Sequence, residues 1–244
     1  MVSLDPATLW LTVTRLIIIL ATIGLGWMTY QSNLLLKKFR PDFNLLLSPP
    51  ETILRILLVG LCLFLVWLSG LPAGQFGLTS ENVGRSLAVG VAIGGGVQII
   101  LNLLSRWAIA QFGQQIYSPI ILQSIVPRRL AEWLPVSIAL IPAVAMEELL
   151  FRSLWLGGFE PVLPLWLVVV LTSVMFGLMH LPQGTLGVIL TATINVVFCG
   201  LFIWSGELLI PLVAHYTINM LQLLLAYTHR DWFDNYPVTG NEHS

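Results

Sequence analysis

The sequence predicts an all-α, polytopic membrane helix bundle, with about seven transmembrane helices and one re-entrant or interfacial segment. Of its 244 residues, 57% are hydrophobic and only 9% are charged. A soluble domain carries about 25% charged residues, so this chain lacks the side chains that would cover a water-facing surface. Apolar stretches of about 20 residues, the length that spans a bilayer, recur along the chain. These two observations exclude an ordinary soluble domain.

The expected spans follow one another along the whole chain. Tryptophan rings favour the headgroup region, and tryptophans mark several of the expected ends: Trp10, Trp27, Trp107, Trp133, Trp155 and Trp204. The segment 113–131 is half polar and broken by Pro119 and Pro127, which indicates a re-entrant or interfacial piece. The stretch 71–85 is expected to be a loop. The seven expected spans are 8–30, 52–70, 86–110, 132–156, 162–181, 185–204 and 207–228.

Charge and cysteine content narrow the class further. The net charge is −1, so nothing indicates nucleic acid as a partner. Cys62 and Cys199 lie in apolar stretches, with no Cys or His at metal-ligand spacing, and are predicted to be buried apolar side chains. The first apolar stretch is too long for a signal peptide, and no small-residue cleavage site follows it.

Basic residues gather in alternate loops. Under the positive-inside rule this distribution predicts an N-terminus outside and a C-terminus inside the membrane. The outer loops carry only Arg85 as a base. We expect an integral, multi-pass protein of a prokaryotic-type cytoplasmic membrane or an internal membrane. The basic residues assigned to the inner side are Lys37, Lys38, Arg40, Arg55, Arg106, Arg128, Arg129 and Arg230.

Three charged residues, Glu147, Glu148 and Arg152, interrupt the fourth apolar stretch. A charge at the centre of a spanning helix costs about 2.5–3.5 kcal/mol on insertion scales, so these residues need partners. Glu148 and Arg152 are four residues apart and share a helical face, which predicts an ion pair. Glu147 points away from that pair, and we infer that it serves another purpose. The alternative is that all three brace neighbouring helices.

Two further helices carry polar residues at helical spacing. Phe176 and His180 are four residues apart, and Pro182 and Gly184 end the helix directly after them. His215 and Asn219 are also four apart and share a face. Taken singly, His180 is more often a satisfied histidine at a helix end, and a His–Asn pair is more often a contact between helices. The other histidines, His229 and His243, are assigned to solvent.

The combination is more informative than its parts, because ionisable residues inside a membrane are functional candidates by default. Glu147, His180, His215 and Asn219 suit hydrolysis: a carboxylate takes a proton from water and a histidine orients that water. A histidine and an amide then donate to the oxyanion. Alternatively, Glu147, His180 and His215 bind a zinc ion whose water attacks. No His-Glu-x-x-His motif signals a metal, and no serine or cysteine has an evident base.

The three motifs Glu147-Glu148-x-x-x-Arg152, Phe176-x-x-x-His180 and His215-x-x-x-Asn219 resemble the signature of the CPBP family. That family comprises the type II CAAX prenyl endopeptidases and the bacteriocin-processing enzymes, also called Abi proteins. The resemblance covers roughly 132–228. Many relatives carry glycine after the arginine, where this chain has Ser153, a change expected to affect packing more than chemistry.

The resemblance implies an intramembrane endopeptidase acting on a membrane-associated peptide or protein, either with or without an attached lipid. It implies that Glu147 and His180 activate water, that His215 and Asn219 form the oxyanion site, and that Glu148, Arg152 and Phe176 support them. Relatives are often labelled metalloendopeptidases, but a metal-free mechanism is favoured here. The chain then divides into N-terminal helices and the interfacial segment (1–131), the catalytic helices (132–228) and a polar tail (229–244), in one membrane domain.

Two other functions are compatible with the same residues. One is a non-proteolytic interaction or bacteriocin-immunity protein on the same fold, and the other is a transporter, because buried charges also mark ion paths. The membrane side of the site is also open at this stage. Eukaryotic CAAX-processing relatives act on the cytosolic side, whereas the loop charges place Glu147 in the outer half of its helix.

Overall fold

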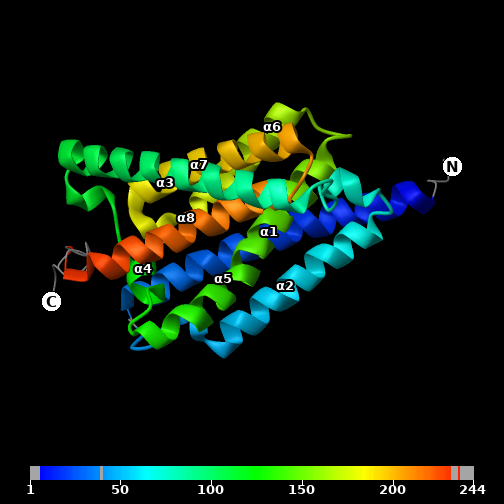
Figure 1. The fold of residues 1–244 in the computed structure, drawn as a ribbon. Helices are drawn as coiled ribbons and strands as arrows, with labels where there is room; N and C mark the ends of the chain where they lie inside the picture. Colours follow the sequence, from blue (N-terminus) through cyan, green and yellow to red (C-terminus); the bar gives the residue numbers. More distant parts are fainter. Residues whose placement is uncertain (1–5, 39–40, 232–235, 237–244) are drawn as a thin grey trace.

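The computed structural model describes residues 6–38, 41–231 and 236, and their regular structure is entirely helical, as predicted (Figure 1). Arg40 and His243, used in the sequence analysis, lie outside the described residues. In chain order the α-helices are α1 (Pro6–Lys38), α2 (Pro49–Leu68), α3 (Val83–Phe112), α4 (Ile120–Ile125), α5 (Trp133–Glu148), α6 (Leu165–Leu178), α7 (Gly184–Ser205) and α8 (Leu209–Thr228). A π-helix, η5 (Leu149–Gly157), continues α5 without a break.

Six segments of the described chain are long and apolar enough to cross a membrane, one fewer than the seven expected. The exception is 162–181, where α6 has only 14 residues and a length of about 21 Å at 1.5 Å per residue. Pro164 precedes α6, and the turn at Met179 and His180 ends it. The six are Thr8–Leu36, Pro49–Leu68, Val83–Phe112, Leu130–Gly157, Leu181–Ser205 and Leu209–Thr228.

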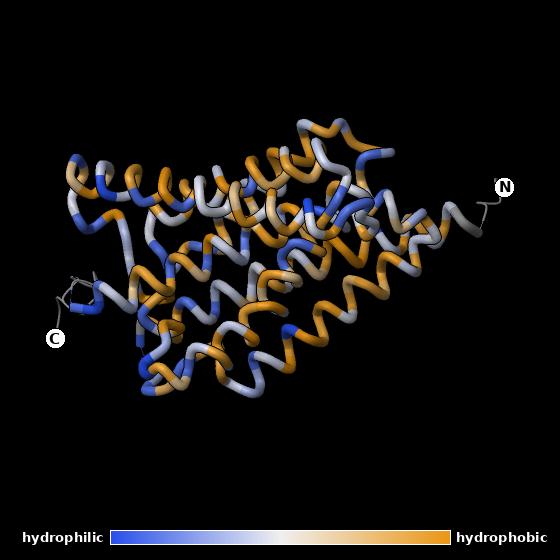
Figure 2. Tube along the Cα trace, in the orientation of Figure 1, coloured by the Kyte–Doolittle hydropathy of each residue, from blue (hydrophilic) through white to orange (hydrophobic). Residues whose placement is uncertain are grey.

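The segment 113–131 contains only short helical turns and the six-residue α4, far too short to span a bilayer. The helices lie alongside one another, and α1 begins at the end of the bundle opposite to that at which α8 ends (Figure 1). Apolar residues dominate the long helices, and hydrophilic residues concentrate at the ends and connections (Figure 2). This distribution is that of a bundle surrounded by lipid.

Small residues bring the helices of the C-terminal half close together. A Cβ atom at Gly94 of α3 would lie 2.6 Å from the carbonyl oxygen of Ala214 in α8. A Cβ atom at Gly177 of α6 would lie 2.8 Å from the carbonyl oxygen of Val188 in α7. Close approach at small residues is the usual way in which membrane helices associate. It holds α3 against α8 and α6 against α7, the helices that carry the second and third motifs and their neighbours.

Two side-chain predictions have different outcomes. Cys62 and Cys199 are both buried and free, as expected. Trp155, however, is not an interfacial anchor: only 6% of it is exposed, and its indole N–H donates to the hydroxyl of Thr22 in α1 at 2.9 Å. The Thr22 hydroxyl lies on a neighbouring helix, so this partner of Trp155 could not be predicted from local spacing.

Candidate active site

The first motif lies at the junction between α5 and the π-helix. Glu148 is the last residue of α5, and Arg152 lies within η5, all nine residues of which are buried. π-helical turns are rare and occur frequently at functional sites. The junction therefore places the charged residues in the most enclosed part of the helix.

Glu148 and Arg152 form the ion pair expected from their spacing. Arg152 Nη1 lies 3.2 Å from Glu148 Oε1, and both side chains are fully buried. The guanidinium carbon also lies 5.3 Å from the ring centre of Phe176 in α6 and 5.1 Å from that of Phe198 in α7. Aromatic faces attract a cation more strongly when water is excluded. Arg152 is thus held by a carboxylate and two aromatic rings from three helical segments.

His215 of α8 lies between the two adjacent glutamates. Its Nδ1 is 2.7 Å from Glu148 Oε1, and its Nε2 is 3.7 Å from Glu147 Oε2. A carboxylate accepts hydrogen bonds, so the Nδ1–H donates to Glu148. Glu148 therefore does more than neutralise Arg152, because it also fixes the orientation of His215. Nε2 is left facing Glu147, whose side chain is 29% exposed.

His180 is held by its own helix. Its Nδ1 lies 2.7 Å from the carbonyl oxygen of Phe176, and because a carbonyl only accepts, Nδ1 carries the proton. The other nitrogen, Nε2, is then a free acceptor in the neutral ring. The Phe176 ring lies 4.7 Å from the ring of His180 and 6.2 Å from that of His215, between centroids. Phe176 thus contacts both predicted histidines.

The predicted residues are gathered, although not all in mutual contact. Glu147, Glu148 and His215 touch directly, and Phe176 connects His215 to His180. No hydrogen bond or ion pair joins His180 to Glu147 in the described part of the chain. Asn219 lies one turn beyond His215 on α8 and forms no hydrogen bond with any described residue, so its amide is free to bind another group.

The donor set does not resemble a metal centre. Among residues 6–38, 41–231 and 236, no group of three or more His, Cys, Asp and Glu side chains is placed to hold a metal ion. His180 stands apart from the Glu147–His215 contact. The zinc alternative of Glu147, His180 and His215 therefore finds no ready set of three ligands in this arrangement.

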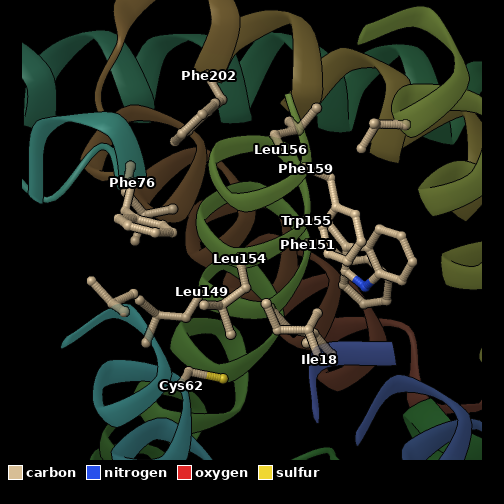
Figure 3. Packing of buried hydrophobic residues seen from close by; sticks show 14 of the residues in the cluster. Ile18, Cys62, Phe76, Leu149, Phe151, Leu154, Trp155, Leu156, Phe159 and Phe202 are labelled. Atoms are coloured by element: carbon tan, nitrogen blue, oxygen red, sulfur yellow. The ribbon is translucent and has the colours of Figure 1, made fainter. Parts of the chain in front are cut away.

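The η2 turn (Ala73–Phe76), between α2 and α3, packs against the π-helix. The Ser153 hydroxyl donates to the carbonyl oxygen of Phe76 at 2.7 Å, and the Gln75 amide donates to that of Gly157 at 2.9 Å. The Phe76 side chain is 1% exposed and packs with apolar side chains of the π-helix (Figure 3). Ser153 is thus a packing and docking residue here, in keeping with the expectation from the sequence.

Sequence reasoning missed two polar residues that the structure places near the site. Arg15 of α1 donates through Nε to the carbonyl oxygen of Gly158 at 2.9 Å, at the C-terminal end of the π-helix. Asn195 of α7 is fully buried and donates to the Ser173 hydroxyl at 3.0 Å. Both were visible as polar residues inside apolar stretches, which is the signal that identified the glutamates.

Glu207, in the connection between α7 and α8, makes this end of the bundle sensitive to pH. Its Oε2 accepts from the hydroxyls of Ser86 (2.5 Å) and Ser80 (2.9 Å), and the hydrogen bond from Ser86 is the main reason that the pKa of Glu207 is lowered from its ordinary value. A carboxyl group whose pKa is lowered in the folded state stabilises the fold at pH values above its ordinary pKa. This stabilisation is lost as the pH falls through the folded-state pKa.

We therefore expect the melting temperature in detergent to fall on acidification below the ordinary glutamate pKa, and to fall less steeply for Glu207→Gln. Differential scanning fluorimetry across this range measures both slopes. Ser86→Ala, which removes the hydrogen bond that lowers the pKa most, should also reduce the slope. Identical slopes for all three proteins would contradict the assignment to Glu207.

Comparison with known proteins agrees with the motifs. Residues 129–221 match a family model described as type II CAAX prenyl endopeptidase Rce1-like. The matched segment contains all three motifs, from Glu147 to Asn219. No curated protein and no solved structure matches the chain. Over this segment, which is less than half of the chain, the sequence is similar to the Rce1-like type II CAAX prenyl endopeptidases.

Proposed function

We propose that this protein is an intramembrane endopeptidase that hydrolyses a peptide bond with water activated by glutamate and histidine. The observation that carries the proposal is the placement of His215, whose ring is fixed by Glu148 at 2.7 Å while its other nitrogen faces Glu147. The family match supports a CAAX-type membrane protease in general. Beyond that general activity, we propose that Glu147 acts on the water and that Glu148 orients His215.

In this mechanism Glu147 takes a proton from the attacking water, and the free Nε2 of His180 orients that water. The water oxygen bonds to the carbonyl carbon of the substrate, whose oxygen becomes negatively charged. When protonated, His215 Nε2 donates to this oxyanion together with the free amide of Asn219. Glu147 then passes its proton to the leaving nitrogen as the C–N bond breaks. The products are a carboxylate and a protonated amine, which together carry both protons of the water, and no metal is required.

The substrate is proposed to carry a lipid chain. A groove of about 290 Å³ lies between α1 and the end of α6. Its lining is largely apolar and includes Met179 and Leu181, the chain neighbours of His180. Apolar lining with a few polar groups is typical of sites that bind hydrophobic ligands. A chain in this groove would tether the substrate beside the second motif.

Access to the site is proposed from the face that bears Arg128, Arg129 and Arg230. Glu147 lies 14 residues from Trp133, or about 21 Å along α5, so the path from that face is deep. Beyond Arg152, η2 packs on the π-helix through Ser153 and Gln75, whereas Glu147 is partly exposed. The positive-inside rule assigns the basic face to the cytoplasm. A path of this depth from the cytoplasmic face would reconcile the loop charges with the position of Glu147.

The proposal is tested by incubating the purified protein in lipid nanodiscs with a farnesylated peptide ending in a CAAX sequence. We expect time-dependent release of the C-terminal tripeptide, detected by mass spectrometry, with a lower rate for the same peptide without its lipid. A chelator should leave the rate unchanged. A folded protein that releases no tripeptide would contradict the proposed substrate and reaction. A protein that cleaves the peptide but is inhibited by the chelator would contradict only the metal-free mechanism.

A further inference from the structure

Asn195 is a fully buried polar side chain in the middle of α7. The hydrogen bonds of its amide group fix its orientation. The Thr172 hydroxyl donates to the carbonyl oxygen of Val168 at 2.8 Å, so it can only accept from Asn195, which lies 3.3 Å away. The Asn195 nitrogen therefore faces Thr172 and Ser173 of α6, and it also donates to the sulfur of Cys199 on its own helix at 3.4 Å. The Asn195 oxygen is left buried with no hydrogen-bond partner among the described residues.

Within the described ranges, the guanidinium group of Arg152 lacks hydrogen-bond acceptors, just as the Asn195 oxygen lacks a donor. Although Nη1 of Arg152 lies close to Glu148, none of the three guanidinium nitrogens makes a well-oriented hydrogen bond with a described residue. Buried polar atoms are nearly always hydrogen-bonded in folded proteins, directly or through water. A guanidinium supplies only donors, and an amide oxygen only accepts. The two groups are therefore matched in chemistry.

Helical geometry places these groups at the same depth. Phe198 lies three residues, about one turn, after Asn195 on α7, and its ring is 5.1 Å from the Arg152 guanidinium carbon. On α6, Phe176 lies one turn after Ser173, the hydrogen-bond partner of Asn195, and its ring is 5.3 Å from the same carbon. Arg152 is thus flanked on both helices by residues one turn from the Asn195–Ser173 contact.

We propose that Asn195 is a positioning residue of the site, whose oxygen accepts from the Arg152 guanidinium directly or through one buried water. Arg152 pairs with Glu148, and Glu148 accepts from His215. Asn195 therefore fixes the orientation of His215 through two intermediate side chains. This inference rests on the proposed function only in the catalytic consequence, because the orientation of His215 is measurable without a substrate.

The test compares Asn195→Leu, which has similar size and no polar atoms, with the matched control Thr172→Val/Ser173→Ala. The control removes the two hydroxyl partners of the Asn195 nitrogen, leaves its contact with the Cys199 sulfur, and keeps the Asn195 oxygen. The first readout is the Nδ1–H signal of His215 in histidine-labelled protein, observed by NMR and assigned by its loss in His215→Gln. We expect Asn195→Leu to shift this signal and the control to leave it in place. Asn195→Ala serves the same comparison if the leucine variant does not fold.

The second readout is cleavage of the farnesylated peptide in nanodiscs. We expect kcat to fall about tenfold in Asn195→Leu with KM little changed, which is the effect of one lost hydrogen bond to a charged group. The control should keep the wild-type kcat and melt at a lower temperature. An unchanged His215 signal in Asn195→Leu, or equal shifts in both variants, would overturn the proposal. Either result would mean that Asn195 only joins α6 to α7. If the wild-type protein cleaves nothing, the proposed function fails, while the NMR comparison still decides the role of Asn195.

Discussion

Glu147→Gln is expected to abolish measurable peptide cleavage while leaving the protein folded. Glutamine has nearly the same shape but accepts no proton, and a general base contributes about 10²–10⁴-fold to the rate. The side chain is 29% exposed, and its contact with His215 is 3.7 Å, so its charge contributes little to the fold. The measurement is the rate of tripeptide release in nanodiscs, together with the melting temperature of the same preparation.

Glu51→Gln is the matched control for this substitution. Glu51 is also a partly exposed glutamate of a spanning helix, and it pairs with Arg55 at 3.3 Å, far from the three motifs in sequence. Its replacement should leave the cleavage rate at the wild-type value. A Glu147→Gln protein that cleaves as fast as the control would remove Glu147 from the reaction.

Arg152→Met is expected to have the largest effect on stability. The substitution leaves the fully buried carboxylate of Glu148 without its cation, and breaking a buried pair in this way costs about 3–5 kcal/mol. Methionine is of similar length and can pack between the rings of Phe176 and Phe198. Unfolding of the detergent-solubilised protein, followed by circular dichroism, measures the loss.

A double substitution separates the loss of the charge pair from simple loss of packing. Glu148→Gln/Arg152→Met removes both charges, and replacing a whole buried pair is often close to neutral. We therefore expect the double variant to be more stable than Arg152→Met alone, although inactive, because Glu148 also orients His215. A double variant less stable than either single variant would contradict the buried ion pair as the main effect.

Local spacing made part of this site predictable. Glu148 and Arg152 are four residues apart, so their pairing required only a helix and no knowledge of its neighbours. The apolar stretches likewise predicted the spans, since length and hydropathy are properties of the sequence alone. For 162–181 the predicted span is longer than the observed helix α6. Hydropathy does not show that Pro164 and the turn at His180 shorten this helix.

Contacts between helices could not be predicted in the same way. The hydrogen bond between His215 and Glu148 joins residues 67 positions apart and depends on the rotation of α8. The sequence therefore assigned Glu148 to Arg152 alone and directed only Glu147 towards the histidines. The π-helix was also hidden, because it leaves the spacing of the motif unchanged. Asn195 required the hydroxyls of Thr172 and Ser173, which lie on another helix.

We infer that the two adjacent glutamates have different roles, Glu147 in the chemistry and Glu148 in the framework. The decisive measurement compares the melting temperature and the cleavage rate of Glu147→Gln and Glu148→Gln side by side. We expect Glu147→Gln to melt like the wild type and to cleave nothing, and Glu148→Gln to melt at a lower temperature and also to lose activity. An active Glu147→Gln protein, or a Glu148→Gln protein that is both stable and fully active, would contradict this inference.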